Sequence, residues 1–239
     1  MSRTNTKMTI TLNETNSDAN VSMVHPNGRV SQKCISAEDL AASLARQHTM
    51  STGIVPTGTR FFKGDRNNYF ITIESPAKVR RFLLHSNTQF YEDREGYRPR
   101  ELQIPYPNCL FSFLVSRRRI QNTWVHSTPN KLGGEGDALS RFPFGNTYED
   151  AHVCWGQVGL PEITSPMALV GVIAMFYDAP FNGDLTDRIT FTRPRDEPDV
   201  TDFWSLVSYL EGKPSFASNL LRGMGVTFQQ HVNSHSRGY

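Results

Sequence analysis

Cysteine is scarce in this sequence of 239 residues: Cys34, Cys109 and Cys154 lie far apart, with no Cys-x-x-C pair. This spacing excludes a disulfide framework and a zinc knuckle. We therefore expect a reduced, cytoplasmic protein that has no metal centre and needs no bound cofactor.

The sequence also lacks a strong excess of one charge and a long apolar run. Lys and Arg number 25 and Asp and Glu number 23, and the net charge of +2 is too small for wide contact with nucleic-acid phosphates. The longest apolar run, Met167 to Tyr177, is about half as long as a membrane-spanning helix. The start of the chain has no apolar segment of the kind found in secretory signals. We expect neither a nucleic acid nor a membrane as a partner.

What the chain does contain is enough apolar sequence for one sizeable core, at 38% hydrophobic residues. We expect a polar extension over residues 1–30, a main domain over 31–212 and a partly ordered tail over 213–239. Two alternating runs in the extension, Met8–Leu12 and Val21–Val24, predict a marginal hairpin, and the sequence from His25 to Gly28 after them is typical of a turn.

The main domain has the pattern of a helix, antiparallel strands, a long loop and closing helices. Ser36 is expected to cap the first helix, which fades near Arg46. The run Cys109–Val115 is apolar throughout, as expected of a central strand that is covered on both faces. This order predicts an α+β domain. The other expected strands are Thr59–Phe62, Tyr69–Ile73 and Arg119–His126, with turns at Gly64–Asn68 and Ser116–Arg118.

Two helices are expected to close the domain. One lies within Ser165–Tyr177 and is apolar nearly all round, so it should be buried on all sides. The other spans Asp199–Glu211, with Asp199 or Thr201 as its cap.

A loop-rich segment from Ser127 to Pro161 carries the candidate chemistry. It places Cys154 eight residues after Asn146, with turn-forming residues around both. A thiolate can carry an acyl group, and a side-chain amide can stabilise the oxyanion that forms on its carbonyl. A cysteine beside Val153 and Trp155 is also typical of a small buried apolar residue, so both interpretations stay open on spacing alone.

The residues around Cys154 resemble the active-site stretch of the ubiquitin-conjugating-enzyme fold. They are more similar to the prokaryotic ubiquitin-conjugating-like family D, which includes protein B of the PRTRC cassettes of bacteria. That family has an apolar-Pro-apolar-x-Asn run followed by Val-Cys-x-Gly. The matching segments here are Phe142–Asn146 and Val153–Gly156, supported by Ile104–Phe111 and Phe176–Phe181.

The resemblance covers about residues 30–185 and implies an antiparallel meander with flanking helices and a long active-site loop. It implies a carrier that accepts a ubiquitin-like protein as a thioester from a ThiF-type activating enzyme and passes it to an amine. Cys154 would be the nucleophile and Asn146 the oxyanion donor. Phe144 and Gly145 stand where the eukaryotic enzymes have His-Pro, a His that the bacterial branch also lacks.

Three residues near Cys154 could support its chemistry, and each also has an ordinary structural interpretation. His152 would face the same side as Cys154 in an extended segment and could act on its thiol, although an exposed loop histidine is the commoner case. Asp150 and Glu149 could orient an incoming lysine, or simply be solvated acids. Cys109 and Cys34 are expected to be buried and inert.

Two other functions stay open. The first is a catalytically inactive conjugating-like fold that serves as a scaffold for a ThiF-type partner or for a plasmid- or phage-encoded assembly. The second is a thiol hydrolase in which His126 or His85 acts on Cys154.

Three other motifs are expected to carry no function of their own. Arg117–Arg119 is interpreted as a solvated turn and Gly133–Gly136 as a flexible loop, because neither has the context of a phosphate site. His231 and His235 lack the Glu of a metalloprotease helix, so no metal is expected there.

Overall fold

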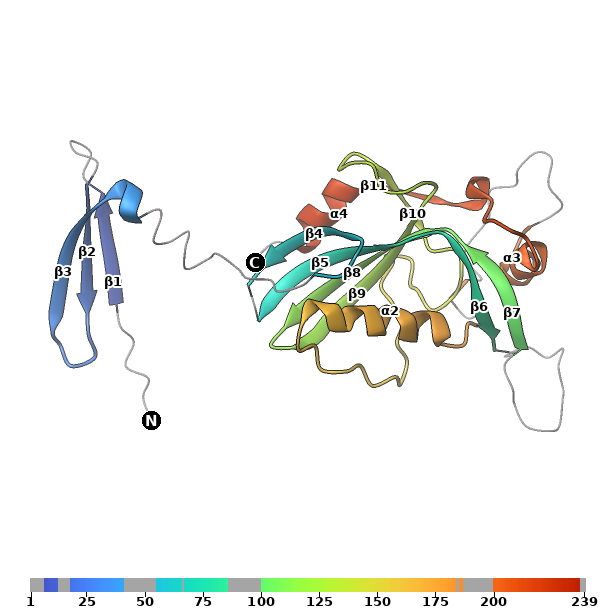
Figure 1. Ribbon diagram of the computed structural model, residues 1–239, viewed down its shortest axis with the longest axis horizontal. Coiled ribbons are helices and arrows are strands. Elements are labelled where there is room, and N and C mark those ends of the chain that lie inside the picture. Colours follow the sequence, from blue (N-terminus) through green and yellow to red (C-terminus); the bar gives the residue numbers. More distant parts are fainter. Residues whose placement is uncertain are drawn as a thin grey trace. The chain divides into compact units, whose positions relative to one another are not determined.

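The computed structural model describes residues 7–12, 18–40, 55–65, 67–85, 100–183, 185–186 and 200–236. The chain forms two compact units, Met1–Ser51 and Thr52–Tyr239, which are described separately. The first unit contains an antiparallel sheet, and the main unit, Thr52–Tyr239, combines antiparallel sheets with helices (Figure 1). The α+β class is therefore confirmed for the main unit.

The first unit is a three-stranded antiparallel sheet of β1 (Lys7–Leu12), β2 (Asp18–Val24) and β3 (Val30–Ser36), with β2 in the middle. The predicted hairpin of β1 and β2 is confirmed. The predicted turn is also confirmed, because the backbone N–H of Gly28 donates to the carbonyl of His25 at 2.9 Å.

The strand β3 is not predicted from the sequence, because its residues are mostly polar and exposed. Since β3 pairs with β2, the units divide near residue 51 rather than at the expected residue 30. Cys34 lies on β3 and is exposed, so the expectation that it is buried is wrong. Ser36 caps the first helix as predicted: its hydroxyl accepts from the N–H of Asp39 at 2.9 Å. Residues 37–40 are helical, and the rest of that predicted helix lies outside the described residues.

The main unit is organised around a six-stranded antiparallel sheet with the order β11-β10-β9-β8-β5-β4. The four strands expected from the sequence are confirmed and form its β4, β5, β8 and β9. The bounds are β4 (Thr59–Gly64), β5 (Asn68–Ser75), β8 (Asn108–Ser116), β9 (Arg119–Thr128), β10 (Ala138–Arg141) and β11 (Gly223–Thr227).

A separate two-stranded sheet, β6 (Lys78–Leu84) and β7 (Arg100–Tyr106), lies between β5 and β8 in the sequence. Neither strand is predicted from the sequence, because charged side chains interrupt the apolar ones in both. Phe82 on β6 is fully buried, and its ring stacks on Phe181 at 4.8 Å between centroids. This contact ties the small sheet to the core.

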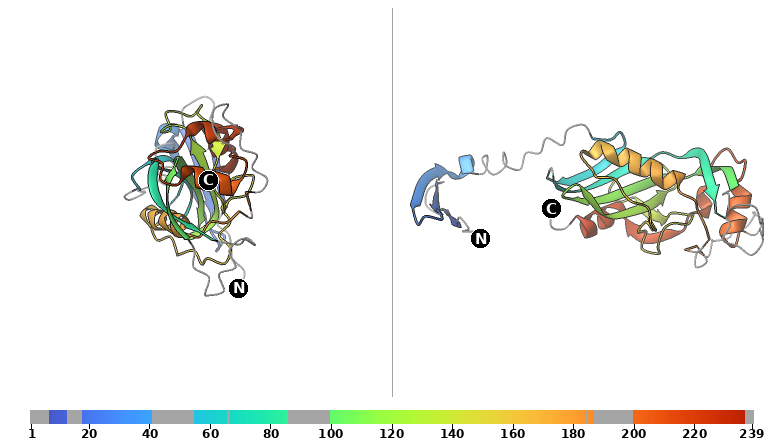
Figure 2. Two further views of the ribbon diagram at one scale, coloured as in Figure 1. Left: turned by 90° about the vertical axis from the view of Figure 1, so that its right-hand side faces the viewer. Right: turned by 90° about the horizontal axis from the view of Figure 1, so that it is seen from below.

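Strand β8 separates two apolar clusters, as its sequence predicts. Phe111 and Phe113 face a large aromatic core under the helix α2 (Leu169–Asp178). Leu110 faces a smaller cluster that contains Phe228 of α4 (Phe228–His235). The two helices lie on opposite sides of the sheet, which the edge-on view makes clear (Figure 2). Successive side chains of β8 point to opposite faces of the sheet, and most of them are apolar on both faces. This pattern is typical of a strand in the centre of a sheet.

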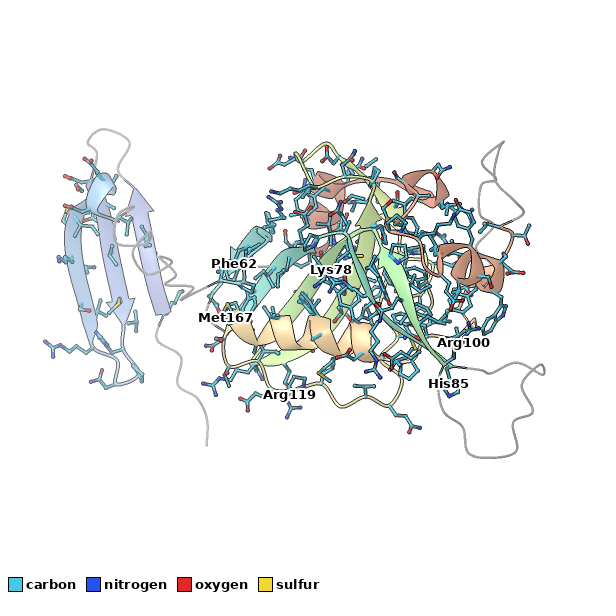
Figure 3. All side chains as sticks on the ribbon, turned by 45° about the vertical axis from the view of Figure 1, so that its right-hand side comes forward. Phe62, Lys78, His85, Arg100, Arg119 and Met167 are labelled. Carbon is cyan, nitrogen blue, oxygen red and sulfur yellow. The ribbon has the colours of Figure 1, made fainter. Side chains whose placement is uncertain are left out.

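The helix α2 buries only one side, so the expectation of burial all round is wrong. A short 3-10 turn, η1 (Pro166–Ala168), precedes it. Val172 is buried, whereas Val170 is 46% exposed and Met167, labelled in Figure 3, is 42% exposed. The helix lies on one face of a sheet and is therefore covered from one direction, although its composition is apolar throughout.

The second closing helix, α3 (Phe203–Leu210), is confirmed with a different cap. Asp202 accepts from the backbone N–H of Ser205, and the Ser205 hydroxyl interacts in return with the backbone N–H of Asp202. This reciprocal box needs an acceptor three residues before Ser205, which only Asp202 supplies. Thr201 is therefore not the cap, and Asp199 lies outside the described residues.

Residues 213–236 are an integral part of the unit, so the expectation of a partly ordered tail is wrong for them. They form a 3-10 turn, η2 (Ser218–Leu220), then β11 at the sheet edge and α4 on its second face. The segment buries few side chains, and β11 contains two glycines, so its sequence carries no clear periodicity.

We expect Phe82→Ala to destabilise the main unit by about 3–5 kcal/mol, because it opens a cavity between β6 and the aromatic core. Urea unfolding followed by tryptophan fluorescence measures this, since all three tryptophans lie after residue 52. The matched control is Arg81→Ala on the same strand, whose ion pair with Glu101 is solvent-exposed. It should cost less than about 1 kcal/mol. Similar losses in both variants would contradict this account of the core.

Candidate functional site

The candidate loop contains a short hairpin from Asn146 to Cys154. The N–H of Cys154 donates to the carbonyl of Asn146 at 2.8 Å, and the N–H of Tyr148 donates to that of His152 at 2.8 Å. The N–H of Ala151 closes the turn on the carbonyl of Tyr148 at 3.0 Å. Asn146 and Cys154, which are eight residues apart in sequence, therefore lie opposite each other.

This hairpin is attached to the edge of β9. The N–H of Val153 donates to Thr123, and the N–H of Val125 donates to Ala151, each at 2.9 Å. Val153 and Thr147 pair across the hairpin and are buried. Since neighbouring side chains on an extended strand alternate between faces, Tyr148, His152 and Cys154 lie on the opposite face from these two.

The hairpin backbone is strained at two residues. Asn146 has φ 64° and Ala151 has φ 68°, in the left-handed region that residues other than glycine rarely adopt. Asparagine tolerates this region better than alanine does. Strain of this kind persists only where surrounding contacts enforce it, and here the pairing with β9 does so.

A second attachment joins the first strand of the hairpin, which begins at Asn146, to the segment that follows α2. The Asn146 side-chain amide donates to the carbonyl of Pro180 at 3.0 Å. A Cβ atom added to Gly145 would lie 2.3 Å from the carbonyl oxygen of Asn182, so only glycine permits this close approach. A primary amide has two N–H groups, and Asn146 therefore keeps one for another acceptor.

Cys154 is partly exposed. Among the described residues, Tyr148 is the side chain that forms a hydrogen bond with its sulfur. The Tyr148 hydroxyl donates to Cys154 Sγ at 3.4 Å. This hydrogen bond raises the pKa of Tyr148 above its ordinary value, so the phenol remains a donor near neutral pH. Tyr148 is not among the site residues predicted from the sequence, although its pairing opposite His152 follows from a turn between residues 148 and 151.

His152 lies on the expected face, but its ring pairs with a carboxylate instead of the thiol. Its Nδ1 is 2.9 Å from the Asp150 carboxylate, and the ring packs on Trp124 at 4.7 Å between centroids. Partial burial alone would raise the pKa of Asp150, but hydrogen bonds from His152 outweigh it and lower that pKa. Glu149, next in the hairpin, is exposed.

Trp155, the next residue after Cys154, turns towards the core. Its Nε1 donates to the Thr123 hydroxyl at 3.3 Å, and its ring lies 6.1 Å from that of Phe176 on α2. Trp155 thus anchors the chain where it leaves the hairpin, while Cys154 stays partly exposed.

The other sequence-predicted candidates lie elsewhere. Cys109 is fully buried, and desolvation raises the pKa of its thiol to about 12, which agrees with an inert residue. His126 is buried on the α4 face, and His85 lies at the end of β6 beside Arg100 (Figure 3). Among the described residues, neither histidine is hydrogen-bonded to Cys154.

The remaining motifs have structural explanations. Arg117 and Arg118 form the tight β8–β9 turn with φ of 50° and 64°, and Arg118 pairs with Glu162. The N–H groups of Gly133 and Gly134 both donate to the carboxylate of Asp137, so that loop is closed on itself.

In the part of the chain that the structure describes, no three His, Cys, Asp or Glu side chains are arranged to hold a metal ion. No described helix is long and apolar enough to cross a membrane.

Comparisons of the chain with models of protein families, with curated protein sequences and with solved structures give no match.

We expect Tyr148→Phe to slow the alkylation of Cys154 by iodoacetamide roughly two- to tenfold near neutral pH, because the sulfur loses its hydrogen-bond donor. Peptide mass spectrometry distinguishes this site from the exposed Cys34. Tyr209→Phe on α3 is the matched control and should leave the rate unchanged. A rate that is equal in wild type and Tyr148→Phe would show that the hydroxyl does not act on the sulfur.

We expect Gly145→Ala to destabilise the main unit by roughly 1–3 kcal/mol, since the new methyl group forces the backbones at residues 145 and 182 apart. The same displacement should break the hydrogen bond from Asn146 to Pro180. Gly159→Ala is the matched control, because a Cβ there meets no atom within 4 Å. Thermal unfolding of the two variants checks this, and equal melting temperatures would refute the close approach.

Proposed function

We propose that this chain is a ubiquitin-conjugating-like carrier that accepts a ubiquitin-like protein from a ThiF-type activating enzyme as a thioester on Cys154. It then passes that protein to an amine. The observation that carries the proposal is the partly exposed Cys154 opposite Asn146 on a doubly anchored hairpin, with a hydroxyl donor at its sulfur. This arrangement supports the proposal together with the sequence resemblance.

The two transfers conserve atoms and charge at Cys154. In the first, its thiolate attacks the carbonyl carbon of the activating enzyme's thioester, a new C–S bond forms, and the old sulfur leaves as a thiolate. In the second, an amine attacks the Cys154 thioester and a C–N bond forms. Cys154 then leaves as a thiolate, and the proton of the ammonium passes to solvent.

Asn146 and Tyr148 have separate roles in this proposal. The second N–H of the Asn146 amide would donate to the oxyanion, while its bond to Pro180 holds the amide in place. The Tyr148 hydroxyl would stabilise Cys154 sulfur as an anion, both as nucleophile and as leaving group. Asp150 and Glu149 lie at the hairpin turn, where an incoming ammonium group would meet negative charge.

The order of elements in the main unit supports a ubiquitin-conjugating-enzyme-like fold. The meander of β4, β5, β8 and β9 precedes the Cys154 hairpin, and α2 follows it. The pair β6–β7 is inserted within the meander. A free catalytic thiol would also suit the reducing cytoplasm, where we propose that the protein acts.

The engaged Asn146 amide favours a second candidate, a scaffold without catalysis. With one N–H bonded to Pro180, Asn146 has a complete structural role of its own. A conjugating-like unit that only binds a ThiF-type partner or a plasmid- or phage-encoded assembly would need Asn146 for this structural role and not as an oxyanion donor.

We expect a thiol-sensitive adduct when the chain is combined with the ThiF-like and ubiquitin-like proteins encoded beside it and with ATP. Non-reducing gels measure the adduct, which should be lost in Cys154→Ala and converted to a thiol-resistant ester in Cys154→Ser. Cys34→Ser is the control and should behave as wild type, because Cys34 lies in the other unit.

An adduct that persists in Cys154→Ala would refute the assignment of Cys154. If no adduct forms although the chain binds its partners, the carrier function is wrong and the scaffold is favoured. Hydrolysis of a simple thioester by the chain alone would instead indicate a thiol hydrolase.

A further inference from the structure

Three histidines that the proposed transfer does not use lie together on the α4 face of the sheet. His126 belongs to β9, and His231 and His235 belong to α4. The ring centroids of His126 and His231 are 4.4 Å apart, and those of His231 and His235 are 4.8 Å apart. His126 is 2% exposed and His231 is 5% exposed, so two of the three imidazoles are shielded from water.

Trp124 connects these histidines to the hairpin that carries Cys154. The centroid of its ring lies 4.3 Å from that of His235 and 4.7 Å from that of His152. The backbones of Trp124 and His152 also pair as an isolated β-bridge. We call His126, His231, His235, Trp124 and His152 the histidine–tryptophan cluster.

The cluster is incompletely hydrogen-bonded. His231 Nε2 is 2.9 Å from the hydroxyl of Ser112. His126 Nδ1 and Trp124 Nε1 are buried and have no partner among the described residues. A buried imidazole with few partners is tolerated as a neutral group, whereas its charged form needs a counter-ion or water.

The charged groups around the cluster offer it little compensation. Asp150 pairs with His152, and its charge opposes the lowering of the His235 pKa, but burial and the nearby His152 outweigh it. At the two ends of α4, Glu135 accepts from Gln229 at 2.9 Å, and the Lys63 ammonium group donates to the Ser236 carbonyl at 3.1 Å. Within the described residues, no carboxylate is hydrogen-bonded to His126, His231 or His235.

Burial and mutual repulsion oppose protonation of these histidines. Burial, followed by the nearby His235, lowers the pKa of His126 to about 4. Burial, followed by His126 and His235, lowers the pKa of His231 to about 2, and burial also lowers the pKa of His235. In an unfolded or opened segment the same side chains titrate near pH 6.5.

The helix α4 is held in the main unit by few buried side chains. It has eight residues and buries only Phe228, His231 and Val232. The strand before it, β11, pairs with β10 at two positions with an irregularity between them. Elements with few buried contacts open at a lower free energy than the rest of a domain.

We infer that the histidine–tryptophan cluster is an acid-sensitive latch that couples the docking of α4 to the hairpin of Cys154. With neutral imidazoles, α4 is docked and Trp124 supports His152. Proton uptake places like charges next to one another at His126, His231 and His235, to which no described carboxylate is hydrogen-bonded. This repulsion releases α4 and removes the packing behind the hairpin. The inference holds whether or not Cys154 carries a thioester.

The direction of the pH dependence follows from linkage. Because the pKa of each of the three histidines is lower in the docked state than in the opened state, the docked state is fully stable above about pH 6.5. It loses stability as the pH falls from about 6.5 towards 4, the value for His126.

Two-dimensional ¹⁵N NMR of the full chain, titrated from pH 8 to pH 4, tests the latch. The backbone amides of α4 and of Tyr148–Cys154 should change together, with one common midpoint between about pH 4 and 6.5. His126→Phe and His231→Gln each remove one protonation site and should lower that midpoint by about half a pH unit or more. His25→Gln, in the first unit, is the control and should leave it unchanged.

Phe228→Ala tests the coupling without acid, since it weakens the docking of α4 at neutral pH. The Tyr148–Cys154 amides should then shift towards their low-pH positions. Separate midpoints for α4 and the hairpin, unchanged midpoints in both histidine variants, or a Phe228→Ala effect confined to α4 would each overturn the latch.

Discussion

The outer edge of β9 is the constraint on which the rest of the main unit depends. One edge of this strand pairs with β8, and the other edge is shared by β10 and the second arm of the Cys154 hairpin. A β-strand edge that is left unpaired exposes a row of backbone donors and acceptors, and here two short segments satisfy it. The hairpin therefore derives its position from backbone hydrogen bonds to a central sheet rather than from its own sequence.

The two faces of the sheet serve the hairpin in different ways. On the α2 face, a dense aromatic core holds Trp155 and the segment around Phe181, so it fixes both ends of the hairpin. On the α4 face, the rings of His231 and His235 lie beside Trp124 together with that of Phe70. One side of the site therefore rests on packing that is insensitive to pH, and the other side on groups that titrate.

The chemistry at Cys154 depends on short-range geometry. The sulfur accepts a hydrogen bond from the phenol of Tyr148, while the imidazole of His152 is engaged with Asp150. We propose thioester exchange rather than hydrolysis for this site, because hydrolysis also needs a general base that activates water. The anchored Asn146 fits both the carrier and the scaffold that we propose as alternatives.

Sequence alone determined the elements whose pattern lies in adjacent residues: the alternation of the β1–β2 hairpin, and the continuous apolar runs of the strand Cys109–Val115 and the helix α2, because such local patterns reflect contact with the core. It also singled out Cys154 and Asn146 by spacing. Only the tertiary structure decided that residues 213–236 complete the sheet and its second face, and that Tyr148 rather than His152 contacts the sulfur. Those outcomes depend on pairing between segments far apart in the chain, and on the carboxylate and ring that engage His152, which no local pattern encodes.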